Sequence, residues 1–314
     1  MDKHLESALA QLLPELARHG ISVAIRRELA YGLQLRLERD GQAATLNIYW
    51  SLKKGISQVL AGKPNSLQAD LEKLLNLGAP ASVGDFHTWE RWIGSDECGK
   101  GDYFGALVVA AFALDAEKVD EIRSLGVLDS KKLTDLQVKG IAHSLYERFS
   151  DRIACVVIKP LRYNEIMADR QSRGENLNDL LAWQHGAAIM ELLGRVPLVR
   201  GVLVDQFSLH KKVSKFLKTK EIGIPVEERP KAESDPAVAA ASVIARYQFL
   251  QSRQAMDRHY KMSFPLGSGK NVLPPAQAFA DKYGWNRLAE VAKLHFVTSR
   301  GVRVRDIFDP PADK

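Results

Sequence analysis

The chain has 314 residues, 46% of them hydrophobic, and a formal net charge of +6 at pH 7, which fits one large globular domain or two ordinary ones. No run of about 18 apolar residues occurs, and the N-terminus lacks the basic-then-apolar order of a signal peptide, so we expect a cytoplasmic protein with no membrane partner. With only Cys98 and Cys155 present, the sequence excludes a disulfide framework, and the small positive excess suits a polyanionic partner.

The first 77 residues predict a small α+β domain. Residues 2–19 have the apolar spacing of an amphipathic helix that is broken or kinked near Pro14 and stopped by Gly20. Two alternating strands flank Asp40-Gly41, a strong hairpin turn, and their apolar residues are Leu33, Leu35, Leu37, Leu46, Ile48 and Trp50. A helix is expected over 66–77. Residues 78–90 have no period and predict a linker, so we place a second domain at 91–314.

The second domain alternates predicted strands and helices. Apolar runs predict a strand ending at Ile93 and strands over 107–114, 153–159, 198–204 and 224–228. Helices are expected from Thr134 or Asp135, over 176–193, over 211–218, from the Asp235 N-cap to about residue 260, and twice within 274–308. In this order the first three strands can form a meander and the later ones can add in parallel, which is an α/β architecture.

An acidic, glycine-rich stretch connects the first two of these strands. It runs Asp96-Glu97-Cys98-Gly99-Lys100-Gly101-Asp102. Glycines permit a sharp turn and let backbone N–H groups approach a ligand, so such a loop can hold a cation and a phosphate together. Neighbouring strand residues point to opposite faces, so Asp96 and Glu97 can share one ion only if the chain kinks between or after them.

Three alternatives fit the same stretch. The spacing from Gly94 to Gly99-Lys100-Gly101 is one residue short of a nucleoside triphosphate P-loop, but Gly101 replaces the hydroxyl that should hold magnesium, and the two carboxylates would repel phosphate. Cys98 is a candidate nucleophile, although no partner His can be placed from spacing alone. A solvated acidic turn is the third alternative, because Asp and Gly are ordinary turn residues.

Two further carboxylates are expected near Asp96 and Glu97. Asp205 ends a buried strand, and Glu233 lies just before the helix that begins after Asp235. If the parallel strands extend the meander, Asp96 is central, with Asp205 on a neighbouring strand and Glu233 close by. Four anions in one cleft are costly, and divalent cations with oxygen ligands are the usual compensation. Two magnesium ions are the known device for in-line displacement at phosphorus.

Lysines that suit a polyanion gather in loops and on one short helix. They are, in chain order, Lys53, Lys54, Lys63, Lys131, Lys132, Lys211, Lys212, Lys215 and Lys218. Loop lysines are usually just solvated, but the last four fall largely on one side of the short helix and form the most concentrated basic patch.

Five segments, in order, resemble the bacterial ribonuclease HIII family. They are Asp-Glu-x-Gly-x-Gly-Asp-Tyr-Phe-Gly at 96–105, Asp-Ser-Lys-Lys-Leu at 129–133, Asn-Leu-Asn-x-Leu-Leu-Ala-Trp-x-His at 176–185, Asp-Gln-Phe at 205–207, and Lys-Ala-Glu-Ser followed by Ala-Ala-Ala-Ser-Val-Ile-Ala-Arg within 231–246. The first segment fits ribonuclease HII equally well. Glu233, the Asn-Leu-Asn helix and the N-terminal extension favour ribonuclease HIII.

The resemblance implies an RNase H-like mixed sheet flanked by helices, with residues 1–77 forming a substrate-binding domain similar to the TATA-binding protein. It also implies a catalytic, metal-binding set of Asp96, Glu97, Asp205 and Glu233. Substrate contacts are expected at Gly99, Lys100, Gly101, Ser130, Lys131, Lys132, Asn178, Lys211, Lys212 and Lys215. Lys100 departs from the family, which commonly has a small hydroxyl residue there, and resembles the basic residue of the ribonuclease HII loop.

The function implied is an endonuclease that uses Mg²⁺ or Mn²⁺, with two ions in the catalytic state, to hydrolyse the RNA strand of RNA/DNA hybrids. The products would carry a 3′-hydroxyl and a 5′-phosphate. We expect a monomer whose partner is the hybrid itself. The alternatives are a hybrid-binding protein without catalysis, a junction nuclease like ribonuclease HII, and a phosphatase or nucleotidase on the same fold. The last would need neither a basic helix nor an added domain.

Overall fold

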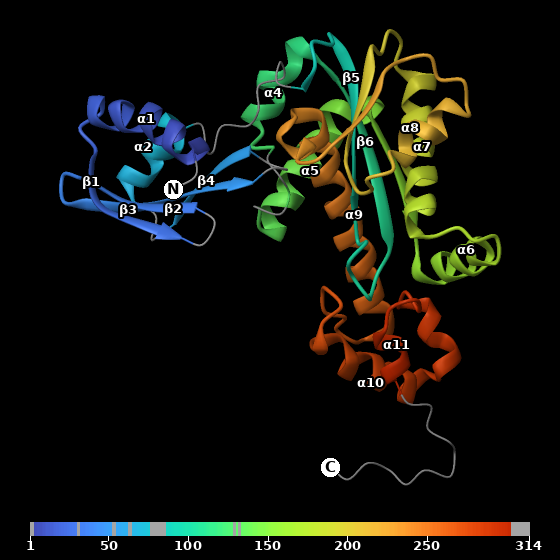
Figure 1. Cartoon of the computed structure of the whole chain (residues 1–314). Coiled ribbons are helices and arrows are strands. Elements are labelled where there is room, and N and C mark those ends of the chain that lie inside the picture. Colours follow the sequence, from blue (N-terminus) through green and yellow to red (C-terminus); the bar gives the residue numbers. More distant parts are fainter. Residues whose placement is uncertain are drawn as a thin grey trace, which may run out of the picture. The chain divides into compact units, whose positions relative to one another are not determined.

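The computed structural model describes residues 3–29, 32–51, 55–61, 65–75, 86–127, 130 and 133–302. The chain divides into two compact units, Met1–Pro80 and Ala81–Lys314, drawn in Figure 1. Residues 78–85 of the predicted linker lie outside the described residues. The first strand of the second unit begins at Arg91.

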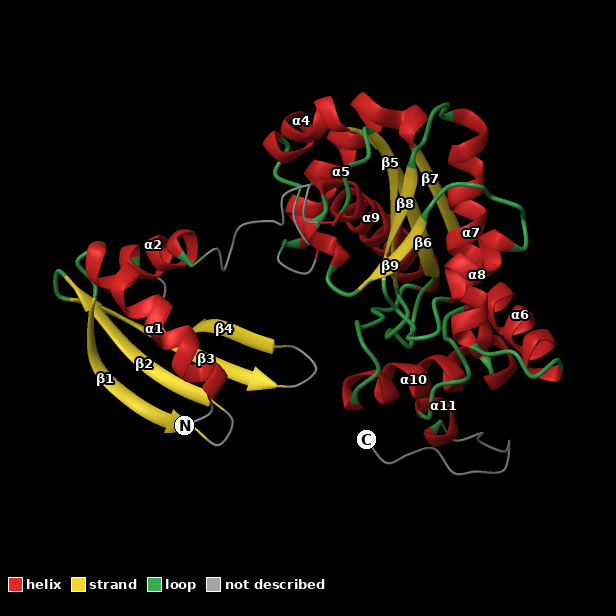
Figure 2. Ribbon diagram, turned by 45° about the horizontal axis from the view of Figure 1, so that its top comes forward, coloured by secondary structure: helices red, strands yellow, loops and turns green. Residues whose placement is uncertain are grey.

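The N-terminal unit is an antiparallel sheet in the order β1-β2-β3-β4 with two helices on one face (Figure 2). Its elements are α1 (Lys3–Arg18), β1 (Ser22–Leu29), β2 (Gly32–Arg39), β3 (Gln42–Ser51), β4 (Gly55–Ala61) and α2 (Ser66–Leu74). The predicted hairpin is confirmed, with Asp40 and Gly41 both at positive φ between β2 and β3. Of the predicted break or kink near Pro14, the break is wrong, because α1 continues through Pro14. Strands β1 and β4 were not predicted.

A leucine-rich core joins the helices of this unit to its sheet. It contains Leu5, Leu9, Leu12 and Leu16 of α1, Leu33, Leu35 and Leu37 of β2, Leu46 and Ile48 of β3, and Leu67 and Leu71 of α2. Burying each such side chain stabilises the unit by roughly 1.5–3 kcal/mol, so the alternation of β2 fixes its register. The same alternation places Gln34, Asn47 and Tyr49 on the other face of the sheet, which no described helix of this unit covers.

The second unit is built on a mixed sheet in the order β7-β6-β5-β8-β9. Its strands are β5 (Arg91–Cys98), β6 (Leu107–Asp115), β7 (Ile153–Ile158), β8 (Gly201–Asp205) and β9 (Val226–Arg229). The first three form an antiparallel meander, and β8 and β9 add in parallel beyond β5, as predicted. Strand β5 is therefore central and pairs with β6 on one side and β8 on the other.

Helices cover both faces of this sheet (Figure 2). They are α4 (Val119–Ser124), α5 (Asp135–Phe149), α6 (Pro160–Ser172), α7 (Leu177–Arg195), α8 (Lys212–Lys218) and α9 (Pro236–Tyr260). Helices α5 and α9 pack on one face, and α7 and α8 pack on the other. The predicted starts are confirmed: Thr134 caps α5, Asn176 caps α7 and Asp235 caps α9. Helices α4 and α6 were not predicted.

Strand β5 and α9 meet at backbone contact distance. A Cβ atom on Gly94 would lie 2.3 Å from the carbonyl carbon of Ala237 and from the nitrogen of Val238. The alanine-rich first half of α9 permits this approach, because small side chains let a helix axis come close to a sheet.

The chain ends in a helical lobe with its own aromatic core. It contains α10 (Leu273–Tyr283) and α11 (Thr298–Gly301), which were predicted as two helices. Short 3₁₀ turns occupy Ala116–Lys118, Ser150–Arg152, Ala232–Ser234, Lys270–Val272 and Trp285–Glu290. Tyr103 and Phe104, which follow β5, are buried in the core of this lobe. Among the described residues, no helix is both long and apolar enough to cross a membrane.

Candidate active site

Asp96 and Glu97 lie on strand β5, which corrects the predicted end of the strand at Ile93. The strand continues to Cys98, with Asp96 paired to Ala110 and Glu97 to Val109 of β6. Two adjacent strand residues point to opposite faces, so the carboxylates of Asp96 and Glu97 face α9 and α7 respectively. The two carboxylates therefore have different surroundings.

Asp96 is buried beneath α9. Its side chain is 8% exposed and accepts hydrogen bonds from Ser242 of α9 and, at 2.7 Å, from the backbone nitrogen of Glu97. Burial, followed by the charge of Glu97, raises the pKa of Asp96 to about 6. The site therefore favours neutralising this carboxylate, either with a proton or with a cation.

Asp205 ends β8 on the α9 face, next to Asp96. Strands β5 and β8 are parallel and pair Ser95 with Val204, so the residues that follow this pair are neighbours. The Asp205 carboxylate accepts a hydrogen bond from the nitrogen of Ala232 at 3.0 Å and shares another with Glu233. Burial, the charge of Asp96 and the charge of Glu233 raise the pKa of Asp205 to about 7. Three of the four predicted carboxylates thus interact on one face.

Glu97 is held by cations on the opposite face. Its carboxylate lies 3.3 Å from Nε2 of His185 on α7 and 3.5 Å from Nζ of Lys100. Burial alone would raise the pKa of Glu97, but the hydrogen bond and charge of His185 and the charge of Lys100 outweigh it, so the pKa lies below its usual value. His185 is in turn fixed by Ser95, whose hydroxyl lies 2.7 Å from Nδ1.

The sequence analysis gave no role in the site to His185, Ser95 or Ser242. His185 lies on the helix predicted over 176–193, but its partner Glu97 lies 88 residues earlier in the chain. Local patterns do not encode such pairings. Phe207, which follows Asp205, stacks on the His185 ring at a centroid distance of 5.1 Å.

The glycine loop after β5 has one constrained and one open position. Gly99 has φ +89°, and a Cβ there would lie 2.2 Å from the carbonyl oxygen of Ala106, so only glycine fits. Gly101 has no atom within 4 Å of a Cβ position, so its backbone is open on that side. Between them, Nζ of Lys100 lies 3.4 Å from the carbonyl oxygen of Phe207 and 5.1 Å from the centre of its ring.

The helical lobe fastens the far end of this loop. Asp102 accepts a hydrogen bond from the nitrogen of Gly267 at 2.6 Å, and the backbones of Phe104 and Ala292 form an antiparallel bridge. Lys293, which is 1% exposed, donates to the carbonyl oxygen of Gly105 at 2.6 Å. Burial lowers the pKa of Lys293 to about 7. A buried lysine thus binds the loop end from inside the lobe.

The structure distributes the predicted substrate contacts over several environments. Ser130 is buried, and its hydroxyl lies 2.8 Å from that of Ser242, the donor to Asp96. Lys131 and Lys132 lie outside the described residues, as do Lys53, Lys54 and Lys63. Asn178 lies in the first turn of α7 and is half-buried. Lys211 precedes α8 and is exposed, Lys212 pairs with Asp179, and Lys215 lines a surface cavity.

The alternatives for the glycine stretch do not fit the fold. A P-loop leads into a helix, whereas strand β6 follows this loop. Burial, together with the charges of Asp102 and Asp96, raises the pKa of Cys98 to about 12, so the thiol stays protonated and is no nucleophile. The acidic stretch is not a solvated turn, because Asp96 is buried in a central strand.

The carboxylate set suits a hard divalent cation chemically. Asp96, Asp205 and Glu233 offer only oxygen ligands, which Mg²⁺ and Mn²⁺ prefer. Among the described residues, no three carboxylate, histidine or cysteine side chains converge in the arrangement of a preformed metal site. Asp205 shares a hydrogen bond with Glu233 and interacts electrostatically with Asp96. Burial first, and the neighbouring negative charges second, raise the pKa values of Asp96 and Asp205, and a bound cation would offset both effects.

The chain resembles known proteins along nearly its whole length. A family model described as Ribonuclease HII matches residues 93–299. Ribonuclease HIII of Protochlamydia amoebophila is 32% identical over 301 residues, covering 94% of this chain and 93% of the relative. Ribonuclease HIII of Chlamydia pneumoniae is 36% identical over 212 residues, covering 66% of this chain and 68% of the relative.

Solved structures agree with the sequence matches. The crystal structure of Bst-RNase HIII in complex with Mn²⁺ has a TM-score of 0.64 and 29% identity, covering 93% of this chain and 95% of that one. RNase H3 of Aquifex aeolicus has a TM-score of 0.53 and 27% identity, covering 92% and 97%. The mixed sheet flanked by helices and the N-terminal antiparallel sheet therefore match RNase HIII structures. By sequence and by fold, the chain belongs to the ribonuclease HIII family, whose members are endonucleases that cut the RNA strand of RNA/DNA hybrids.

Proposed function

We propose that the enzyme cuts RNA by metal-dependent hydrolysis in which Asp96 would be the central ligand of two divalent cations. Asp205 and Glu97 would complete the metal shells, and Glu233 would hold the second ion or orient the attacking water. The observation that carries this proposal is the parallel pairing of β5 with β8, which makes Asp96 and Asp205 neighbours, with Glu233 hydrogen-bonded to Asp205 on the same face. The Mn²⁺ complex of Bst-RNase HIII supports it.

Two such ions, when bound, activate a water and stabilise the leaving oxygen at phosphorus. The residues of the chain prepare the site for them. Ser242 and the Glu97 nitrogen fix the Asp96 carboxylate, and His185 with Lys100 keeps Glu97 ionised and in place. The products would carry a 3′-hydroxyl and a 5′-phosphate.

We propose that Gly99, Lys100 and Gly101 distinguish RNA from DNA. The 2′-hydroxyl is the group on the RNA backbone that allows this by hydrogen bonding. The open backbone at Gly101 supports the proposal, since nothing in the described structure accounts for a glycine there. Lys100, near the carboxylate of Glu97, could add a charge-assisted contact to the adjoining phosphate.

The N-terminal unit is proposed as the substrate-binding domain. Its sheet has one face that no described helix of the unit covers, and Asn47 and Tyr49 lie on it. Polar and aromatic side chains on a twisted sheet can contact sugars and bases of a duplex. We further propose a cytoplasmic protein, which the two unbridged thiols of Cys98 and Cys155 support, and a monomer. Light scattering on the protein peak eluted from a size-exclusion column tests the oligomeric state.

The experiment that tests the proposed mechanism uses an RNA/DNA hybrid labelled at the 5′ end of its RNA. Cleavage is expected with Mg²⁺ or Mn²⁺ and none with EDTA. Calorimetric titration of Mn²⁺ into the protein should show binding that Asp205→Asn weakens at least tenfold. Cleavage that survives EDTA would contradict the mechanism. Binding of the hybrid without cleavage under any metal would favour the non-catalytic alternative.

A further inference from the structure

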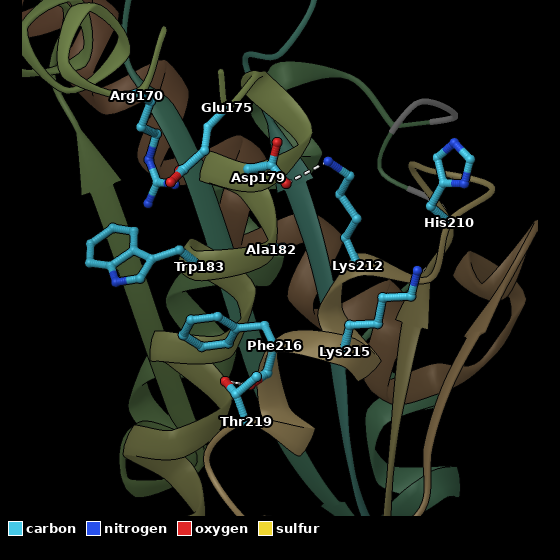
Figure 3. Close-up of a pocket in the computed structure, with 10 residues that line it drawn as sticks. All are labelled: Arg170, Glu175, Asp179, Ala182, Trp183, His210, Lys212, Lys215, Phe216 and Thr219. Atoms are coloured by element: carbon cyan, nitrogen blue, oxygen red, sulfur yellow. Dashed lines mark hydrogen bonds and ion pairs between the residues drawn. The ribbon is translucent and has the colours of Figure 1, made fainter. Parts of the chain in front are cut away.

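A cavity of about 680 Å³ opens between α7 and α8, and its lining includes none of the four carboxylates (Figure 3). Ala182 and Phe216 form an apolar floor. The helices are in close contact here, because a Cβ on Gly186 would lie 2.2 Å from the Phe216 ring. Trp183 lies beside this floor and is 37% exposed. The cavity therefore presents an aromatic ring and a flat apolar surface to solvent.

The rim of the cavity is cationic. Both acidic lining residues are already in ion pairs, Glu175 with Arg170 and Asp179 with Lys212. Lys215 and His210 also line the cavity and are exposed, and neither makes an ion pair with any described residue. Figure 3 shows Lys215 and His210 across the cavity from Trp183. A ligand with an aromatic face and a negative charge would satisfy both sides.

A nucleotide combines these two features. Base stacking on aromatic side chains, together with cations along the backbone, is the general mode of single-strand recognition. The bases of a duplex are already stacked and paired, so they cannot lie on Trp183. The matching occupant is an unpaired nucleotide.

The cavity lies within reach of the catalytic carboxylates. His210 follows Asp205 by five residues, which span at most roughly 18 Å. Each strand of a duplex carries one phosphate per roughly 3.4 Å of axis, so the His210 edge of the cavity lies no more than about five nucleotides from Asp205. A single strand that leaves the end of a bound hybrid can cover this distance.

We propose that the cavity between α7 and α8 binds one unpaired nucleotide of a single strand flanking the hybrid, with its base on Trp183 and its phosphate at Lys215. The proposal goes beyond the hybrid endonuclease function and assumes that the hybrid is bound at the carboxylates. It assigns this face of the enzyme to junctions between duplex and single strand.

The test compares binding of a blunt hybrid with binding of four other hybrids. Each of these carries a single-stranded adenine extension on one of the four possible strand ends. Fluorescence anisotropy is measured in the Asp205→Asn background, so that cleavage does not interfere. One extension is expected to increase affinity about tenfold, in line with stacking of a single base. Trp183→Ala should reduce that gain to less than twofold, and Trp183→Phe should keep part of it.

Lys215→Glu provides a second variant that does not disturb the packing of Trp183, and it should also abolish the gain. Lys218→Ala is the matched control on the same helix, because Lys218 does not line the cavity, and its gain should equal that of the parent. No gain with any of the four extensions, or an equal gain in parent and Lys215→Glu, would overturn the proposal. Cleavage of the blunt hybrid by the enzyme with Asp205 intact reports separately on the endonuclease function.

Discussion

Asp96 accepts a hydrogen bond from Ser242 on one face of the central sheet, whereas its neighbour Glu97 contacts His185 on the other at 3.3 Å. The alternation of strand β5 causes this separation. Asp96 shares its face with Asp205 and Glu233. Glu97 can reach the same ion only past the strand end, where the chain turns at Gly99. The two carboxylates are thus expected to differ in how strongly their loss affects metal binding.

Replacing Asp96 or Asp205 by Asn should abolish cleavage, because each removes an anionic ligand from the α9 face. Binding of the hybrid should stay within a few-fold of wild type, since much of the affinity comes from phosphate contacts. Glu233→Gln should be milder than either. Single-turnover cleavage and anisotropy separate the two effects. Near wild-type turnover by Asp205→Asn at saturating Mg²⁺ would show that the metal site is wrongly placed.

The concentration of metal ion needed for cleavage should increase as the pH falls. The pKa values of Asp96 and Asp205 are raised to about 6 and about 7, chiefly by burial, and a protonated carboxylate is a poor ligand. The Mg²⁺ concentration for half-maximal cleavage should therefore rise at least tenfold between pH 8 and pH 6. A concentration independent of pH would contradict the assignment.

Stability without metal should show the same titration. A carboxylate whose folded pKa is raised contributes stability below its unfolded pKa near 4, and this contribution is lost as the pH rises through about 7. The melting temperature of the metal-free protein should thus fall between pH 5 and pH 8, by about 5 °C more than the melting temperature of Asp205→Asn falls over the same range. That variant is the matched control, because it keeps the titrating groups away from the site, such as Lys293, that also contribute in this pH range.

Removing residues 1–80 should leave a folded enzyme with weaker substrate binding. The two units have separate cores, so the 81–314 fragment should melt cooperatively. Its KM for the hybrid should rise at least several-fold, and its binding should depend less steeply on salt than that of the full chain. An insoluble fragment would show that the units stabilise each other, and an unchanged KM would contradict a role in substrate binding.

Lys100→Thr should alter substrate preference. Lys100 contacts Glu97 and Phe207, so its loss removes a cation beside the catalytic set and restores the hydroxyl common in the family. We predict cleavage of extended hybrids by the wild type, with appreciable activity on a lone ribonucleotide in duplex DNA. The variant should lose the second activity more than the first, with Mg²⁺ and Mn²⁺ tested separately. An equal loss on both substrates would make the lysine a general phosphate clamp.

Lys293→Met should loosen the loop that follows Gly101. The substitution leaves the buried carbonyl of Gly105 without its donor, which costs about 1–3 kcal/mol. KM should rise more than kcat falls, because the loop is proposed to contact substrate while the carboxylates remain in place. Thermal melting and steady-state kinetics measure the two effects. A variant with unchanged stability would mean that water replaces the lysine.

Most of the catalytic fold could be predicted because its signals are local. The capped starts of α5, α7 and α9 and the run of β6 were found from sequence. The length of β5 was not predicted, because Gly and Asp are typical turn residues. In the structure, pairing with β6 on one side and β8 on the other overrides that preference. Strand β1 was not predicted, because it is exposed and its apolar residues do not alternate regularly with polar ones.

The candidate site could be predicted only in part, because only its local signals can be recognised in the sequence. Carboxylates at strand ends and before helices can be recognised in the sequence, so Asp205 and Glu233, which interact in the structure, could be proposed as site residues. His185, Ser95 and Ser242 act through contacts with residues distant in the chain, which no local pattern encodes. Contacts of Asn178, Lys211 and Lys215 with substrate stay predictions.

The contact between Gly94 and the first turn of α9 determines how this enzyme can vary. Main-chain atoms touch there, so the spacing between the carboxylate of Asp96 and the hydroxyl of Ser242 does not depend on the bulk of any side chain. Volume-conserving exchanges of aliphatic residues around α9 are therefore expected to change the melting temperature more than the cleavage rate. In a library of core variants, thermal stability should likewise vary while turnover does not. Gly94 should be the position that tolerates no replacement.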